Sequence, residues 1–261
     1  MPPKPRDDKN GASAGSRFPR CRTGIEGLDK ILNGGIPLGN NVLLTGACGT
    51  GKTTLGAEFL NFGAQNGEPG LMLAVTEHSQ KVIENMNSYE FFDQKLVDDK
   101  KLQFLDTQPL FERLGLDKVE YAHPDIAPLI TAITDTVKQA GAKRLVIDSI
   151  TGILLHLKTR ELMRDFISKL CRRLTDAGCT TLLVSEIAPD EKRYSSFGVE
   201  EAVADGIVVL GNVEQRGYLL RTLHVVKMRG TPHSRSKYVI DLTPYGIIIV
   251  PLLRSSAVGP A

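Results

Sequence analysis

The sequence has 261 residues, of which 41% are hydrophobic and 24% are charged, a globular composition long enough for one domain with a sizeable core. Its 32 basic and 30 acidic side chains leave a net charge of +2, which excludes a whole-molecule field that would by itself attract nucleic acid. It contains no run of about 18 consecutive apolar residues, so no membrane insertion is expected.

The first 20 residues are rich in proline, glycine, serine and charge and contain almost no apolar side chains. Such a segment cannot offset the entropy of its own ordering, so residues 1–20 are predicted to form a disordered basic tail. It has neither the apolar core of a secretory signal nor the acid-poor pattern of a transit peptide, which favours a cytoplasmic protein. A short flexible tail is also expected at 255–261, leaving one domain over 21–254.

Hydrophobic patterns predict alternating strands and helices in the first part of this domain, and strands alone in the last part. The predicted strands are 41–45, 70–75, 101–105, 143–147, 180–185, 206–210, 218–228, 237–242 and 246–250, and the predicted helices are 55–64, 81–89, 126–140 and 161–177. This order predicts an α/β fold with a mostly parallel, twisted sheet flanked by helices and antiparallel C-terminal strands at one edge.

A glycine-rich stretch at 46–53 joins the first predicted strand to the first predicted helix and matches G-x-x-x-x-G-K-[ST]. Its glycines let successive backbone N–H groups point at one anion, and the following helix adds its positive dipole end. We expect Lys52 to bridge the β- and γ-phosphates of ATP and the Thr53 hydroxyl to ligate Mg²⁺. A glycine-rich turn without a ligand is the alternative, which the strand and helix on either side disfavour. The nucleotide contacts predicted here are Gly46, Gly49, Thr50, Gly51, Lys52, Thr53 and Thr54.

Two carboxylates are predicted at the carboxyl edge of the same sheet. Asp148 ends the apolar run 145–147, so it can hold Mg²⁺ directly or through water, although an aspartate capping the next turn would look the same. Glu77 follows the strand at 70–75 and can activate the water that attacks the γ-phosphate. The alternative for Glu77 is an acid at the positive end of the next helix. His78 is expected to be a surface neighbour.

Two cations end the predicted strand 218–228. Alternation places Leu223, Val225, Lys227 and then Arg229 on one face, so the two charges should project together. They can pair with carboxylates of their own chain, or act as fingers that stabilise a phosphoryl group bound to a neighbouring subunit. Spacing alone does not choose between these alternatives.

Several motifs together resemble the KaiC family of RecA-like ATPases over about Cys21 to Leu253. They are TGIEGLD at 23–29, GGIPLG at 34–39, the phosphate-binding loop, LVIDS at 145–149, GVEE at 198–201 with Asp205, and KMRGTPH at 227–233. The resemblance implies a homo-oligomer, a hexameric ring with ATP between adjacent subunits. It also implies that Lys227 and Arg229, with Thr231 and His233 nearby, reach the γ-phosphate of the next protomer.

The chain departs from the family pattern after the second strand. Family members usually have two adjacent glutamates there, whereas this chain has Thr76 and Glu77, so one catalytic carboxylate is left and slow hydrolysis is expected. Glu200 and Glu201 stand where the clock protein has autophosphorylation sites, so an autokinase activity is not supported. Cys48 occupies a variable position of the loop and is treated as a tolerated small residue.

Three functional hypotheses follow. The first is a Mg²⁺-dependent ATPase in which Lys52, Glu77, Lys227 and Arg229 are catalytic, Thr53 and Asp148 hold the metal, and turnover drives a switch or motor component with an unknown protein partner. The second is a non-hydrolysing ATP-binding assembly or sensor protein, like relatives associated with the archaellum. The third is a RadA-like recombinase, which the neutral body, the lack of an added DNA-binding domain and the few aromatic candidates for base stacking disfavour.

Overall fold

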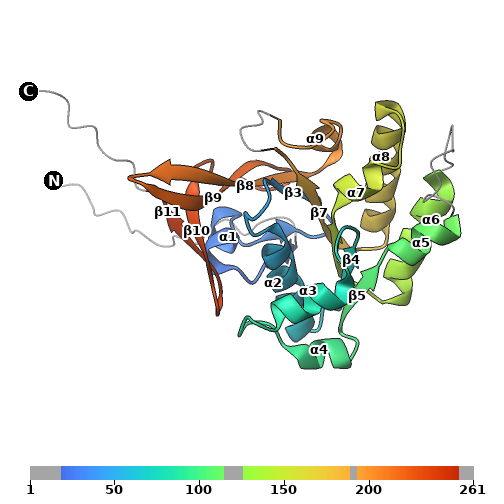
Figure 1. Ribbon diagram of the computed structural model, residues 1–261, viewed down its shortest axis with the longest axis horizontal. Coiled ribbons are helices and arrows are strands. Elements are labelled where there is room, and N and C mark those ends of the chain that lie inside the picture. Colours follow the sequence, from blue (N-terminus) through green and yellow to red (C-terminus); the bar gives the residue numbers. More distant parts are fainter. Residues whose placement is uncertain (1–18, 115–125, 189–192, 253–261) are drawn as a thin grey trace, which may run out of the picture.

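The computed structural model describes residues 19–114, 126–188 and 193–252. Within these ranges the largest sheet has the strand order β11 (Gly246–Pro251), β10 (Tyr238–Thr243), β9 (Tyr218–Met228), β8 (Gly206–Gln215), β3 (Asn41–Gly46), β7 (Thr180–Glu186), β6 (Arg144–Asp148), β4 (Gly70–Ala74) and β5 (Leu102–Asp106) (Figure 1). Neighbours from β8 to β5 pair in parallel, whereas β9, β10 and β11 continue the sheet antiparallel from β8. The predicted fold class is therefore confirmed.

A small second sheet lies at the start of the domain. It pairs β1 (Arg20–Cys21) with β2 (Ile36–Pro37), and α1 (Glu26–Ile31) lies between them in sequence. The predicted N-terminal tail falls outside the described residues except for Pro19 and Arg20, and Arg20 begins β1. The C-terminal tail at 255–261 also falls outside them.

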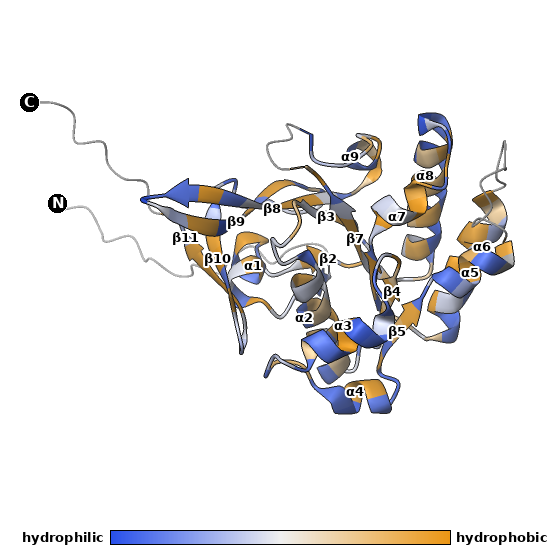
Figure 2. Ribbon diagram, in the orientation of Figure 1, coloured by the Kyte–Doolittle hydropathy of each residue, from blue (hydrophilic) through white to orange (hydrophobic). Residues whose placement is uncertain are grey.

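Helices cover both faces of the large sheet (Figure 1). One core contains residues of α1, α2 (Lys52–Gln65), α3 (Ser79–Met86) and α4 (Gln94–Asp98) together with Val42 and Leu44 of β3. The other contains Leu43 of the same strand and residues of α5 (Gln108–Leu114), α6 (Ile126–Gln139), α7 (Ile150–Leu154) and α8 (Arg160–Asp176). Because alternate residues enter opposite cores, the central strands are buried on both sides and are mostly hydrophobic, whereas α3 and α4 are largely hydrophilic (Figure 2).

Each predicted strand and helix has a counterpart, and its bounds are those predicted for β9 and differ by one to five residues for the others. The helix after the phosphate-binding loop begins at Lys52 rather than Leu55, and the strand predicted at 206–210 continues to Gln215. Five helices of 4 to 7 residues were not predicted: α1, α4, α5, α7 and α9 (Glu200–Val203). Such helices are too short to show a helical repeat in a sequence window.

The alternation expected along β9 fails near its end. The pairing of β9 with β8 contains a bulge between Val225 and Lys227. One extra residue moves every later side chain to the opposite face. Met228 therefore joins Leu223 and Val225 in the first core, and Lys227 turns toward α9, so the prediction that Lys227 shares their face is wrong.

The parallel strands bring their carboxyl ends to one edge of the sheet, where ligands bind in open α/β folds. That edge follows the last residues of β3, β4, β6 and β7.

None of the helices in the described ranges is long and apolar enough to cross a membrane.

Candidate functional site

A cavity of about 310 Å³ lies at this carboxyl edge. Residues of the phosphate-binding loop line it together with Glu77 and Asp148. Three segments that were selected separately from the sequence are thus brought together around one space. The volume is at the lower end of the range for small-molecule sites.

The phosphate-binding loop has the tight backbone that its glycines predict. Gly51 has φ +98°, a left-handed conformation that suits glycine, and α2 begins at the next residue. A Cβ on Gly46 would lie 2.3 Å from the carbonyl oxygen of Leu210, so only glycine fits there. The Thr50 hydroxyl donates to the Ala47 carbonyl over 2.8 Å and closes the loop on itself.

Lys52 lies in the floor of this loop, and its side chain is buried. Its Nζ donates to the carbonyl oxygens of Gly46 and Ala47, each over 2.9 Å. Burial lowers the pKa of Lys52, while the negative charges of Glu186 and Asp148 oppose that shift. An ammonium group has three donors, so one N–H of Lys52 is left for an anion in the cavity.

Thr53 and Asp148 meet at the same place. The Thr53 hydroxyl donates to Asp148 Oδ2 over 2.7 Å, although the two residues are 95 positions apart. Burial raises the pKa of Asp148, and the Thr53 hydrogen bond and the Lys52 charge lower it. A hydroxyl beside a carboxylate suits Mg²⁺, which prefers oxygen ligands and is usually held by one or two carboxylates plus phosphates. The described residues contain no cluster of three or more His, Cys, Asp or Glu that could hold a metal ion by itself, so phosphates would have to complete this site.

Glu77 lies between β4 and α3 and lines the cavity. Its Oε1 accepts a hydrogen bond from Asn85 Nδ2 over 3.4 Å and lies 3.7 Å from Lys81 Nζ. The start of α3 is instead capped by Asp106 of β5, which accepts from the Ser79 amide over 2.7 Å. Glu77 itself lies two residues before α3, so the alternative of an acid at the positive end of that helix stays open.

Two charged side chains, one in the cavity lining and one bonded to the phosphate-binding loop, were not predicted from the sequence. Glu186 ends β7 and lines the cavity, and the signal that revealed Asp148, a carboxylate after an apolar run, was present for it too. Arg221 of β9 donates from Nε to the Gly49 carbonyl over 3.2 Å, so a cation from the antiparallel strands touches the phosphate-binding loop. No local motif marks Arg221, because a bond between strand and loop separated by 172 positions leaves no pattern in the sequence.

Lys227 and Arg229 lie away from this cavity, beside α9. Lys227 Nζ donates to the carbonyl oxygens of Glu201 and Ala204 over 3.2 and 2.6 Å. Arg229 forms an ion pair with Asp205 at 3.1 Å, with an Arg229 side chain that is 54% exposed. The two cations do project together, as predicted, and Arg229 has the local carboxylate that the sequence left open as an alternative.

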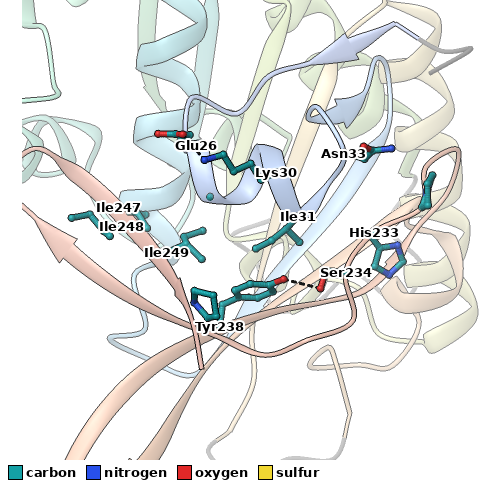
Figure 3. A pocket seen from close by; sticks show the side chains of 13 residues that line it. Glu26, Lys30, Ile31, Asn33, His233, Ser234, Tyr238, Ile247, Ile248 and Ile249 are labelled. Carbon is teal, nitrogen blue, oxygen red and sulfur yellow. Dashed lines mark hydrogen bonds and ion pairs between the residues drawn. The ribbon is translucent and has the colours of Figure 1, made fainter. Parts of the chain in front are cut away.

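Thr231 and His233 follow these cations in the chain, and His233 but not Thr231 lines a second hollow, a groove of about 710 Å³ between α1, β11 and the loop before β10 (Figure 3). The Thr231 hydroxyl donates to the Leu32 carbonyl over 3.2 Å. His233 lines the groove, and neither of its buried ring nitrogens has a hydrogen-bond partner among the described residues. The groove is larger than the cavity but contains no residue of the phosphate-binding loop, so one chain does not bring His233 to that loop.

Comparison with known proteins gives one consistent result. A family model described as the KaiC ATPase matches residues 21–254. UPF0273 proteins of Pyrococcus furiosus and Thermotoga maritima are 38% and 39% identical over 235 residues, covering 89% of this chain and 94% and 96% of theirs. The circadian clock oscillator protein KaiC of Synechococcus elongatus is 35% identical over 244 residues, and the aligned part is 93% of this chain but 46% of that protein. The chain thus spans about half the length of the clock protein.

A solved structure agrees with these sequence matches. The crystal structure of a KaiC-like protein from Pyrococcus horikoshii has a TM-score of 0.76 and 35% sequence identity to this chain. The match covers 90% of this chain and 100% of that one.

Proposed function

The chain belongs to the KaiC family of ATPases, and on that basis we propose that it binds Mg-ATP in the cavity at the phosphate-binding loop and hydrolyses it slowly. The sites are shared between neighbouring copies in a homo-oligomeric ring, whose turnover serves a switch or motor component. The meeting of Lys52, Thr53 and Asp148 at one cavity is the observation that carries this proposal.

Each residue at the cavity has a role that its position supports. Lys52 and the loop amides hold the phosphates, and Thr53 and Asp148 hold Mg²⁺, which would supply positive charge against the phosphate oxygens. Glu77 orients the attacking water and accepts its proton. Its present partners, Asn85 and Lys81, are weak contacts at 3.4 and 3.7 Å, so rotation of Glu77 toward the cavity costs little.

Lys227 and Arg229 complete the site from the neighbouring copy. Their distance from the cavity of their own chain supports a role between subunits, since neither residue lines it. The local pair of Arg229 with Asp205 is an exposed one of the kind that contributes about 1 kcal/mol or less, so it can be exchanged for a phosphate.

The hydrolase assignment is tested by release of inorganic phosphate from Mg-ATP. We expect slow turnover by the wild type and a loss of about 100-fold or more for Glu77→Gln, which keeps the shape of the side chain but not its basicity. Glu112→Gln, an exposed change on α5, is the matched control and should behave as the wild type. Equal and negligible rates for all three chains would refute hydrolysis.

The shared site is tested by mixing two inactive variants. Lys52→Ala removes the nucleotide side of an interface, and Arg229→Ala removes the finger side. If sites lie between copies, equal amounts that co-assemble randomly should regain about one quarter of wild-type activity, because one interface in four is then intact on both sides. A site closed by its own chain gives no recovery. Light scattering with and without Mg-ATP measures the assembly itself.

A second candidate function is ATP binding without turnover, as an assembly or sensor protein. The observation that favours it is the single glutamate at 76–77, where two adjacent glutamates are usual in the family. Nucleotide-dependent assembly by a chain that releases no phosphate would establish it.

A further inference from the structure

The hairpin of β10 and β11 forms one wall of the cavity. Leu242 of β10 lines the cavity, and its methyl carbons lie 3.1 Å from where a Cβ on Gly51 would be. The turn after β10 is tied to the loop after α3, because the Glu90 amide donates to the Pro244 carbonyl over 2.7 Å. The position of the hairpin therefore affects the shape of the cavity next to the phosphate-binding loop.

A carboxylate of α2 holds this hairpin. Glu58 Oε2 accepts a hydrogen bond from the Ile247 amide, at the start of β11, over 2.9 Å. The approach is so close that a Cβ on Gly246 would lie 2.7 Å from Glu58 Oε1. The turn itself is fixed by Thr243, whose hydroxyl donates to the Gly246 carbonyl over 2.7 Å. Displacement of Ile247 therefore moves Leu242 as well.

The surroundings of Glu58 are unusual for a carboxylate. Burial raises the pKa of Glu58 to about 7, and the Ile247 hydrogen bond opposes that shift. The titratable residues on β10, on β11, in the turn between them and in the loop after α3 are Tyr89, Glu90, Asp93, Tyr238, Asp241 and Tyr245. None of them contributes to the pKa shift of Glu58.

We propose that Glu58 is a positioning residue that holds the β10–β11 hairpin as a wall of the nucleotide cavity, and that this hold weakens when its carboxyl group loses its proton. The inference rests on the proposed nucleotide site. When the hairpin opens, Glu58 reaches water and its pKa returns toward the ordinary value of about 4.3. The pKa of Glu58 is higher when the hairpin is closed than when it is open. The contribution of Glu58 to the stability of the closed hairpin is therefore complete below about pH 4, falls as the pH rises toward 7 and is constant above that.

The hold is tested without nucleotide by amide hydrogen exchange in the full chain. Protection factors, which correct for the intrinsic effect of pH, should be about tenfold lower for the β11 amides at pH 8 than at pH 6 in the wild type. Glu58→Gln removes the titration, so its protection should not change with pH, whereas the control Glu112→Gln should follow the wild type. The same pH dependence in Glu58→Gln, or none in the wild type, would overturn the proposal.

The link to the cavity is tested by the affinity for a fluorescent ADP analogue. Glu58→Ala and Leu242→Ala should each weaken binding about three- to tenfold, and the double variant should bind no more weakly than the weaker-binding single variant, because both changes remove the same wall. Additive losses would overturn the link. A wild-type chain that binds no nucleotide would refute the proposed function, and the exchange result would still decide whether Glu58 holds the hairpin.

Discussion

The two halves of the sheet differ in how their functional residues are brought together. In the parallel half, loop, helix and carboxylates follow directly from the ends of β3, β4 and β6, and one chain builds the cavity. In the antiparallel half, Lys227, Arg229 and His233 lie outside that cavity and bind mainly to their own backbone or to nothing among the described residues. The cavity at the phosphate-binding loop is therefore a local property of a strand–loop–helix unit, whereas under the proposed function Lys227 and Arg229 complete the site only from a neighbouring copy.

The largest expected effect on phosphate release comes from a change at the phosphate-binding loop. Lys52→Ala removes the only lysine that lines the described cavity and should lower phosphate release by about 1,000-fold, with loss of nucleotide binding, because no other ammonium group of the described residues lines that cavity. Lys138→Ala, at an exposed position of α6, is the control and should leave turnover unchanged. Turnover and nucleotide affinity are measured together. Wild-type affinity in Lys52→Ala would mean that the loop amides bind the phosphates without Lys52.

The same difference explains what the sequence predicts well. The strands that build the cavity are continuous apolar runs, and each ends in a residue that the next loop needs, so the amino-acid order is enough to identify Lys52, Thr53 and Asp148. Glu77 is placed at the cavity for the same reason. Local order along the chain is sufficient when the chemistry sits at the ends of parallel strands.

The antiparallel half is less predictable because its geometry depends on pairing. The bulge in the pairing of β9 with β8 places Lys227 on the face of the sheet opposite to the one predicted. No sequence pattern within 218–228 indicates this bulge. Arg221 reaches Gly49 only because β9 lies next to β8 and β8 next to β3. The sequence likewise does not predict that the ring nitrogens of His233 have no hydrogen-bond partner among the described residues. Their surroundings come from α1, β11 and the loop before β10, and α1 is far from the other two in the chain.

Two glycines of the antiparallel half test how strongly packing acts there. Gly246 and Gly217 both have left-handed φ values, +128° and +80°, but a Cβ at Gly217 would meet nothing within 4 Å, whereas one at Gly246 would meet Glu58. Gly217→Ala should cost about 1 kcal/mol from backbone strain alone. Gly246→Ala should cost about 2–3 kcal/mol, because overpacking adds to the strain.

The free energy of unfolding of both glycine variants is measured with urea. Equal costs would show that the hairpin moves away from α2 without resistance, which contradicts a firm wall of the cavity. A larger loss in Gly246→Ala, restored in part by Glu58→Ala, would show that the contact between these two residues is responsible.

The smallest expected effect on phosphate release comes from the residue that caps α3. Comparing it with the cap of α4 distinguishes a loss of stability from a loss of turnover within the parallel half. Asp106→Ala removes the acceptor of the Ser79 amide, and Asp93→Ala removes the equivalent acceptor of the Lys95 amide at α4. Each loss of a cap should cost about 1 kcal/mol of stability. Because α3 begins two residues after Glu77, only Asp106→Ala should also lower phosphate release, about two- to fivefold, by loosening the segment that carries Glu77. α4 has no residue at the cavity, so equal turnover in the two variants would mean that Glu77 is positioned by the phosphates rather than by β5.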